Sequence, residues 1–238
     1  MTANPLQTLL TTVETPDEAL NQRFLRARDL VRNSSPDALP DDHRIPALLA
    51  IGDHGAALDR LRALRPLSGP QFELLLHYAI WTGDQRWLAA LGAEGLRGIS
   101  GTPPQPGRGT ATALQRGRDS TATLTPAESA ELVMRAIVEL WGVVPNGAGQ
   151  SVAIEPSLPA EWGWMNLRNL RIGETLLDFV LRRTRNGLSL TVRRTRGPAI
   201  RLVLTMAGIQ EFDVDGEALT GGRAIFRVEN EVGITMQR

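Results

Sequence analysis

The sequence contains neither lysine nor cysteine, so all 26 of its basic residues are arginine, and they are balanced by 26 acidic residues. The absence of lysine excludes Schiff-base chemistry and lysine-dependent phosphate loops, because no amine side chain is present. The absence of cysteine excludes disulfides, thiolate nucleophiles and cysteine-rich zinc sites. The net charge of zero gives no reason to expect a nucleic acid as a partner. Carboxylates are therefore the candidate catalytic groups.

Long hydrophobic runs are absent as well. No stretch approaches ~18 consecutive apolar residues, so we expect no transmembrane helix and no membrane partner. The first thirteen residues lack the basic start and the unbroken apolar segment of a secretory signal. The hydrophobic share of 42% is sufficient for a packed core. We therefore expect a cytoplasmic protein.

The 238 residues change their pattern near residue 145. Before this point apolar residues recur at helical spacing, and after it they alternate as in strands, with turn signals between the runs. We predict helical hairpins over 1–97, a flexible linker rich in glycine, proline and threonine over 98–124, the last helix of the helical region over 125–145, and a β-domain over 146–238.

Capping residues mark the predicted helices. Thr15, followed by proline, is predicted to be the N-cap of the first helix, and Thr125 is predicted to open a second helix with Glu128 in a capping box. Asp53 and Asp84 each follow a glycine and precede a helical stretch, which favours a capping role for both. The predicted helices cover 18–32, 46–51, 53–64, 70–81, 85–91 and 126–141.

The second half is predicted to form antiparallel strands. The clearest signal is Asn186-Gly187 between two alternating runs, because both residues can adopt the positive φ of a type I′ hairpin turn. Seven short strands with alternating patterns favour a two-sheet β-sandwich, which makes the chain α+β. The predicted strands cover 151–155, 165–172, 175–183, 188–194, 200–206, 211–214 and 224–228.

Several segments at this junction form a recognisable pattern. They are Ala130–Trp141, Gly142-Val143-Val144-Pro145, Ile154–Pro159, Glu161-Trp162-Gly163 and Leu167–Gly173. The pattern is similar to the last helix and the following β-sandwich of bacterial six-hairpin glycosidases, the group of glycogen-debranching-type and α-L-rhamnosidase-like enzymes. Upstream, the stretches 47–64 and 72–88 resemble paired helices of the α/α toroid in that family.

The chain is too short for the complete fold of that family. Six hairpins require about twelve helices, and at ~11–12 residues per helix these exceed what precedes residue 145. The resemblance therefore implies an incomplete α/α toroid of antiparallel helical hairpins, followed by an antiparallel β-sandwich. An incomplete toroid should expose an apolar face, so we expect self-association or a partner that covers this face.

Glycoside hydrolysis requires two carboxyl groups that flank the scissile bond, ~5–5.5 Å apart for retention or ~6.5–9.5 Å apart for inversion. The resemblance assigns neither group to a position in this chain. Our candidates are Glu73 and Asp84 in the helical half, although Asp84 also fits a helix cap. Asp41-Asp42-His43 lies between prolines and is predicted to be a solvated loop.

Aromatic side chains are the candidates for sugar binding, because flat rings stack on sugar faces. Trp81, Trp87 and Trp162 are candidates, with packing of the hairpins and of the two halves as the alternative role. The three histidines lack metal-ligand spacing, so we expect neither a metal nor a cofactor. Arginines 182, 183, 185, 193 and 194 near the hairpin fit either an anion-binding patch or a solvated strand face.

Two functions are consistent with these features. The first is a carbohydrate-active protein related to six-hairpin glycoside hydrolases, truncated, with a carbohydrate ligand and, if it is active, hydrolysis through paired carboxylates. The alternative is a non-catalytic module for glycan binding or subunit interaction. Two carboxylates from different helices that converge in an open cleft near Trp81 or Trp87 would favour hydrolysis, whereas a closed helical bundle would favour the alternative.

Overall fold

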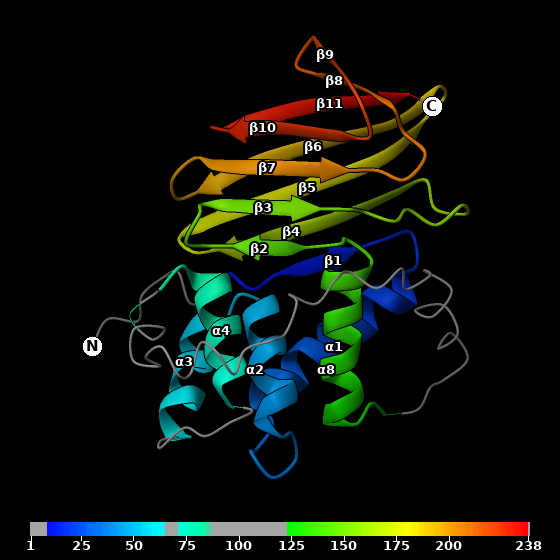
Figure 1. The fold of residues 1–238 in the computed structure, drawn as a ribbon. Helices are drawn as coiled ribbons and strands as arrows, with labels where there is room; N and C mark the ends of the chain where they lie inside the picture. The colour runs from blue at the N-terminus through cyan, green and yellow to red at the C-terminus, as the bar shows by residue number, and fades with distance from the viewer. Residues whose placement is uncertain (1–8, 65–70, 85, 87–122, 238) are drawn as a thin grey trace.

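The computed structural model describes residues 9–64, 71–84, 86 and 123–237, which form a layer of five α-helices and two β-sheets (Figure 1). The expected mixed α+β class is confirmed. No helix in these described ranges is long and apolar enough to cross a membrane. The linker predicted over 98–124 and the helix predicted over 85–91 lie almost entirely outside the described residues.

The helices follow the predicted order. They are α1 (Glu18–Asn33), α2 (Asp41–Ala50), α3 (His54–Ala63), α4 (Gln71–Thr82) and α8 (Pro126–Met134). The predicted capping box of α8 is confirmed, because the Thr125 hydroxyl accepts the Glu128 amide and the Glu128 carboxylate accepts the Thr125 amide. Beyond Met134 the helix continues as a π-helical turn over Arg135–Glu139, where the Leu140 amide donates to the Arg135 carbonyl at 2.8 Å.

The predicted N-cap of α1 is wrong. The cap is Asp17, whose carboxylate accepts the Leu20 amide at 3.1 Å. Thr15 is buried at the corner between β1 (Thr12–Glu14) and the helix, where its hydroxyl donates to the Asn21 side chain at 3.0 Å. The short strand thus holds Thr15 two residues before the capping position, where Asp17 supplies a charged acceptor instead.

The loop predicted for Asp41-Asp42-His43 is also wrong, because α2 begins at Asp41 and contains Pro46 in its interior. The Asp41 carboxylate accepts two hydrogen bonds from the Arg60 guanidinium of α3, at 2.8 and 2.7 Å. Asp41 and Asp42, the two acidic residues in the first turn, also stabilise the helix by interacting with the positive end of its dipole. The sequence pattern predicts that this helix begins at Pro46. The contact of Asp41 with α3 therefore extends α2 upstream of that proline.

The larger sheet has seven strands and the smaller sheet has four. The larger has the order β1, β4 (Trp164–Ile172), β5 (Thr175–Thr184), β6 (Gly187–Arg196), β11 (Glu231–Gln237), β8 (Glu211–Val214) and β9 (Glu217–Thr220). The smaller has the order β10 (Arg223–Val228), β7 (Ile200–Thr205), β3 (Ser151–Ile154) and β2 (Val144–Asn146).

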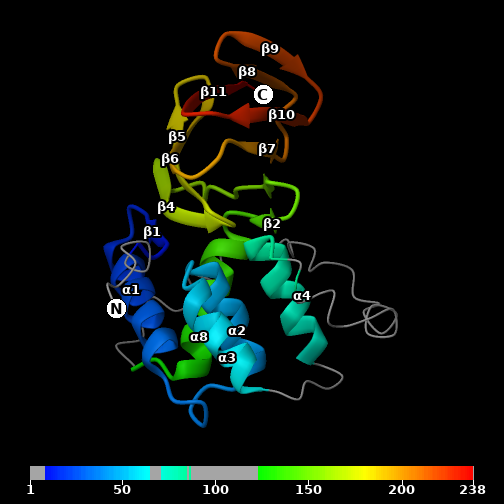
Figure 2. The same ribbon diagram turned by 90° about the vertical axis from the view of Figure 1, so that its left-hand side faces the viewer.

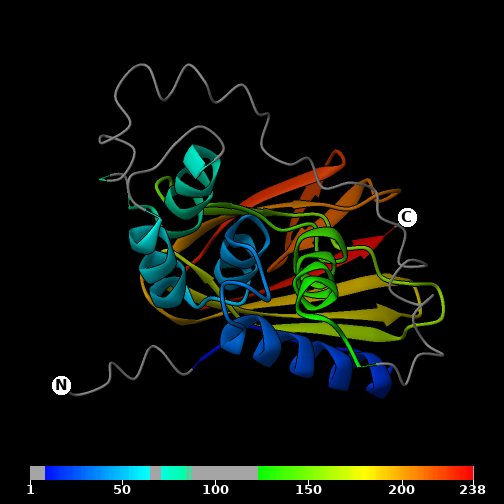
Figure 3. The same ribbon diagram turned by 90° about the horizontal axis from the view of Figure 1, so that it is seen from below.

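Four of these strands, β1, β2, β9 and β11, are absent from the prediction. The pairing is antiparallel as expected except between β3 and β7, which run parallel, so the smaller sheet is mixed. The two sheets lie one in front of the other (Figure 1). The helices lie next to the β1 edge of the larger sheet and the β2 edge of the smaller sheet (Figures 1 and 2). Seen from below, α1 lies along the β1 edge of the larger sheet and α4 lies on the side of the smaller sheet (Figure 3).

The predicted hairpin joins β5 and β6, but its turn is shifted by one residue. Thr184 pairs with Gly187, so the turn residues are Arg185 and Asn186, and neither has a positive φ. Gly187 is needed for a different reason: a Cβ at this position would overlap the carbonyl oxygen of Met236 in β11. The glycine permits a close approach of a third strand.

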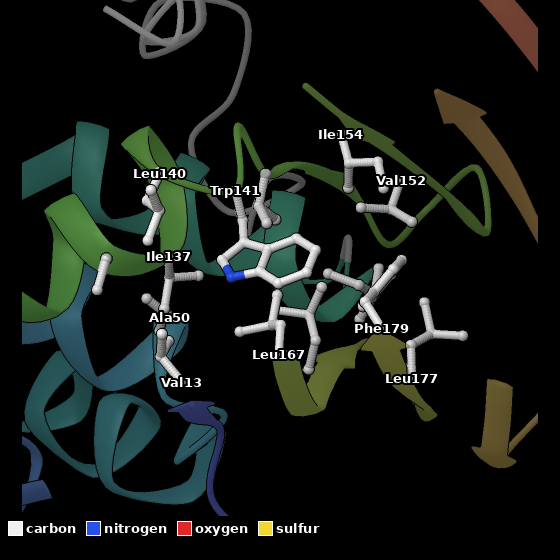
Figure 4. Packing of buried hydrophobic residues seen from close by; sticks show 14 of the residues in the cluster. Val13, Ala50, Ile137, Leu140, Trp141, Val152, Ile154, Leu167, Leu177 and Phe179 are labelled. Atoms are coloured by element: carbon white, nitrogen blue, oxygen red, sulfur yellow. The ribbon is translucent and has the colours of Figure 1, made fainter. Parts of the chain in front are cut away.

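One hydrophobic cluster connects the helices with both sheets. Trp141 lies at its centre, fully buried, with its ring centroid 5.9 Å from that of Phe179 in β5. Figure 4 shows the indole between Ile137 of the helical layer, Leu167 of the larger sheet and Val152 of the smaller sheet. Because protein cores are closely packed, this shared core fixes the helices relative to the sheets.

Candidate functional site

The two candidate catalytic carboxylates lie at opposite ends of α4. Glu73 is exposed in the first turn, and Asp84 follows the last helical residue, Thr82, by two positions. At 1.5 Å per residue, Glu73 and Thr82 are about 13 Å apart along the helix axis. This separation exceeds the ~5–9.5 Å of glycosidase carboxylates. The structure does not bring Glu73 and Asp84 together as a pair.

Asp84 is held in an ion pair. Its carboxylate accepts hydrogen bonds from Nε and a terminal nitrogen of Arg86, at 2.8 and 2.7 Å. The Arg86 guanidinium holds the pKa of Asp84 below its ordinary value. A glycosidase general acid requires the opposite shift, because it must carry a proton near neutral pH. Asp84 is therefore suited to remain ionised rather than to donate a proton.

Trp81 is only 4% exposed and lies where α4 meets both sheets. Its carbonyl accepts the amide of Gly173 in the β4–β5 turn at 2.8 Å, and the neighbouring Ile80 carbonyl accepts the amide of Gly147 after β2 at 2.6 Å. Figure 2 shows the end of α4 directly below β2. The burial of this indole favours the packing role that was the alternative to sugar stacking.

Trp162 is 3% exposed and belongs to the shared core. Its carbonyl accepts a hydrogen bond from Arg183, which also donates to the Pro159 carbonyl at 3.1 Å. Trp87 lies outside the described residues. Neither of the two candidate indoles that the structure describes has a free ring face for a sugar, and sugar binding by the candidate rings stays a prediction.

A polar cluster, buried at Asp53 and His54, joins α1, α3, α4 and β4. Asp53 caps α3 as predicted, accepting the Ala56 amide at 3.2 Å, and it pairs with Arg32 at 3.0 Å. Burial, together with the charge of Arg171, lowers the pKa of His54 to about 3, so the imidazole is neutral. Burial also lowers the pKa of Arg171. Asp53 and His54 are buried, so neither is open to a substrate.

Tyr78 lies at the edge of the same cluster. Burial, with the nearby negative charge of Asp84, raises the pKa of its phenol, so the hydroxyl stays protonated at neutral pH. The described residues contain no group of three or more histidine and acidic side chains that could hold a metal ion. The cluster thus offers neither a thiolate or metal centre nor an activated hydroxyl.

The arginine run near the β5–β6 hairpin is partly used by the fold itself. Arg183 donates to backbone carbonyls, as described above. Arg194 donates to the carbonyls of Glu229 and Gly197 and to the Asn230 side chain. These two guanidinium groups are therefore not available to form an anion-binding patch, whereas Arg182 and Arg193 are exposed on the outer face of the larger sheet.

The structure adds a surface that the sequence reasoning missed, which we call the outer face. It is the side of β4, β5, β6 and β11 that points away from the smaller sheet. The strand register places Trp164, Arg182, Ser189 and Thr235 side by side in one row across these four strands. The inward-facing positions next to them, Met165, Leu181, Leu190, Ile234 and Met236, belong to the buried core. Trp164 is 37% exposed.

Two further rows continue the outer face. The next row contains Asn166, Val180, Thr191 and Gly233. The third contains Arg168, Asp178, Arg193 and Glu231, and in it Arg168 lies 3.6 Å from Asp178. The alternation along β4 could have identified Trp164, because an outward position beside the inward Met165 and Leu167 predicts an exposed ring.

The sequence matches no family model and no curated protein. Among solved structures, the chain is similar to an α-L-rhamnosidase from Dictyoglumus thermophilum, with 13% identity and a TM-score of 0.37 over 65% of this chain and 20% of that one. It is similar to a Streptomyces avermitilis α-L-rhamnosidase complexed with L-rhamnose, with 17% identity and a TM-score of 0.31 over 82% and 21%. It is also similar to a GH127 β-L-arabinofuranosidase from Geobacillus stearothermophilus T6, with 11% identity and a TM-score of 0.28 over 94% of this chain and 42% of that one.

The chain spans about a fifth of the length of both rhamnosidases. Likeness at these TM-scores carries no argument about function.

Proposed function

We propose that this chain is a carbohydrate-related protein of glycoside-hydrolase descent that binds a glycan on the outer face of its larger sheet. The observation that carries the proposal is the exposed indole of Trp164, in register with Arg182 and Ser189. An indole offers a flat apolar surface to the face of a sugar ring. The neighbouring guanidinium and hydroxyl groups can hydrogen-bond to sugar hydroxyls.

The dimensions of the outer face support this proposal. Neighbouring strands lie ~4.8 Å apart, so the row from Trp164 in β4 to Thr235 in β11 extends over about 14 Å. The strand ladders hold these groups in place before a ligand arrives, which reduces the entropic cost of binding.

Descent from six-hairpin glycosidases is supported by the sequence resemblance at the junction of the two halves. Consecutive helices such as α2 and α3 pack against each other, as in helical hairpins, and we interpret them as part of an incomplete α/α toroid. The two sheets share one hydrophobic cluster, in which Leu202 of β7 and Phe179 of β5 are both fully buried. We interpret this arrangement as the expected β-sandwich.

Binding on the outer face is tested by replacing Trp164. We expect Trp164→Ala to weaken glycan binding about tenfold or more, which corresponds to about 1.4 kcal/mol. The control is Ile225→Ala, which removes another exposed apolar side chain, 50% exposed, from β10 of the other sheet. Affinity electrophoresis in gels containing polygalacturonate, xylan or dextran measures both variants. Equal mobility shifts of wild type and Trp164→Ala in every gel would contradict the proposal.

Hydrolysis is the second candidate function, and the ionised, 17% exposed carboxylate of Asp84 is the observation that favours it. Such a group can act as a base or nucleophile, but it needs a separate proton donor. We expect no turnover of aryl glycosides or α-glucans by the wild type. Turnover that is lost in Asp84→Asn and retained in Glu73→Gln would establish hydrolysis instead, with Asp84 as a catalytic residue.

A further inference from the structure

We infer that the glycan bound on the outer face is acidic, and that the carboxylate of a uronic acid pairs with Arg182. This inference rests on the proposed glycan binding at Trp164 and adds the chemical class of the ligand. It starts from the position of Arg182, which lies directly opposite Trp164 in the β4–β5 ladder. Directly opposed residues on one sheet face have Cβ atoms ~4.5–5.5 Å apart, so the indole and the guanidinium are neighbours.

Arg182 differs from the other arginines nearby in what surrounds it. Within the part of the chain that the structure describes, the side chain of Arg182 forms neither a hydrogen bond nor an ion pair. Arg168 lies 3.7 Å from Glu14 and 3.6 Å from Asp178. The strand partners of Arg182 are an indole and a hydroxyl group, so no carboxylate opposes it on either side.

Arg193 provides the contrast on the same face. Its strand partners are Asp178 in β5 and Glu231 in β11, so two carboxylates flank it. The acidic residue in the row of Arg182 is Asp213 of β8, three strands away. Three strand spacings amount to about 14 Å, which is longer than the ~8 Å Debye length at physiological ionic strength. The Glu14 carboxylate in the adjacent row accepts a hydrogen bond from Asn166 at 2.8 Å and lies 3.7 Å from Arg168, so among the described residues no carboxylate pairs with Arg182.

A uronic acid fits this arrangement. The carboxylate of a uronic acid projects from the edge of the sugar ring, so a ring stacked on Trp164 can direct its carboxylate towards the adjacent strand. A guanidinium binds a carboxylate through two parallel charge-assisted hydrogen bonds. Ser189, the next residue in the row, adds a hydroxyl donor beside the guanidinium. A neutral sugar would leave the charge of Arg182 unpaired.

The test compares polygalacturonate with the same polymer after chemical reduction of its carboxyl groups. We expect the wild type to bind polygalacturonate more tightly than the reduced polymer, measured by isothermal titration calorimetry with the full chain. Arg182→Gln should weaken binding of polygalacturonate about tenfold and weaken binding of the reduced polymer much less, since the charge-assisted hydrogen bond is lost whereas glutamine still donates to a sugar hydroxyl. Arg193→Gln, the matched control on the same face, should bind both polymers as the wild type does.

The outcomes separate the inference from the proposed function. Equal wild-type affinity for both polymers, with no effect of Arg182→Gln, would overturn the acidic ligand and leave glycan binding intact. Equal weakening by Arg182→Gln and Arg193→Gln, or equal affinity for a single-stranded DNA oligomer, would mean general polyanion attraction and would also overturn it. Failure of the wild type to bind either polymer or any neutral glycan would overturn both proposals. Circular dichroism melting curves establish that each variant is folded.

Discussion

At the scale of single residues, glycine is required where two backbones approach each other closely. We expect Gly187→Ala to lower the free energy of unfolding by about 2 kcal/mol or more, because the new Cβ overlaps the Met236 carbonyl oxygen and β11 must move. Gly163→Ala is the control, since nothing lies within 4 Å of a Cβ built there. Urea unfolding measures both variants. Equal stabilities would show that β11 does not press against Gly187.

His54 makes the protein sensitive to acid. Its pKa is about 3 in the folded chain and ~6.5 when unfolded, so the unfolded state binds the extra proton between these values. The free energy of unfolding is highest above pH ~6.5, where the imidazole is neutral in both states. It falls as the pH decreases from ~6.5 towards the pKa of the folded state. Between pH 7 and pH 5 we expect a loss of about 2 kcal/mol from this group.

Urea unfolding at pH 7 and pH 5 measures this loss. His54→Gln should lose less stability over the same interval, because glutamine does not titrate. A wild-type unfolding free energy that is the same at both pH values would contradict the assignment, whether or not the variant folds well enough to be compared.

At the scale of elements, the start of α2 depends on a contact between helices. We expect Asp41→Ala to cost about 1–3 kcal/mol, because it leaves the Arg60 guanidinium without its bidentate partner. Asp42→Ala should cost less than about 0.5 kcal/mol. The two carboxylates are adjacent in sequence, but their side chains are 12% and 70% exposed. Thermal unfolding compares the two variants, and equal melting temperatures would refute a role for the ion pair.

Most helices and strands could be predicted from the sequence, because apolar periodicity and capping residues are local signals. The short strand β1 could not, since its three residues pair with β4 more than 150 positions away. The strand β11 alternates Val232, Ile234 and Met236 on its buried side, but Gly233 interrupts the run with a weak strand former. The turn after Thr184 lies one residue earlier than predicted, because Gly187 is required for the close approach of β11 and not for the turn itself.

The candidate site was harder to predict than the fold. Trp162 and Trp164 flank the same glycine, and composition alone does not distinguish them. The register between β4 and β5 exposes Trp164, whereas Trp162 before the strand is buried in the core. The sequence could not show whether Glu73 and Asp84 lie close together. In the structure Glu73 lies in the first turn of α4 and Asp84 lies just beyond its last residue, so they are at opposite ends of one helix. The exposure of each tryptophan and the separation of the two carboxylates depend on tertiary structure, which local sequence patterns do not encode.

At the scale of the whole molecule, we predict self-association or a partner that covers an exposed apolar face of the helices. Large apolar side chains that are exposed among the described residues include Leu9, which precedes β1, and Leu30 of α1. Sedimentation velocity at micromolar concentration should show a concentration-dependent increase in mass. A strictly monomeric species would count against self-association and leave only a separate partner.

The central claim, glycan binding at Trp164, is tested most directly by the indole N–H signals in a ¹H–¹⁵N NMR spectrum. The chain has five tryptophans, and Trp141 and Trp162 are buried references. Addition of oligogalacturonate should shift the Trp164 signal, assigned by its loss in Trp164→Ala, while the Trp141 and Trp162 signals stay in place. A Trp164 signal that does not move at saturating concentrations of acidic and neutral oligosaccharides would contradict glycan binding on the outer face.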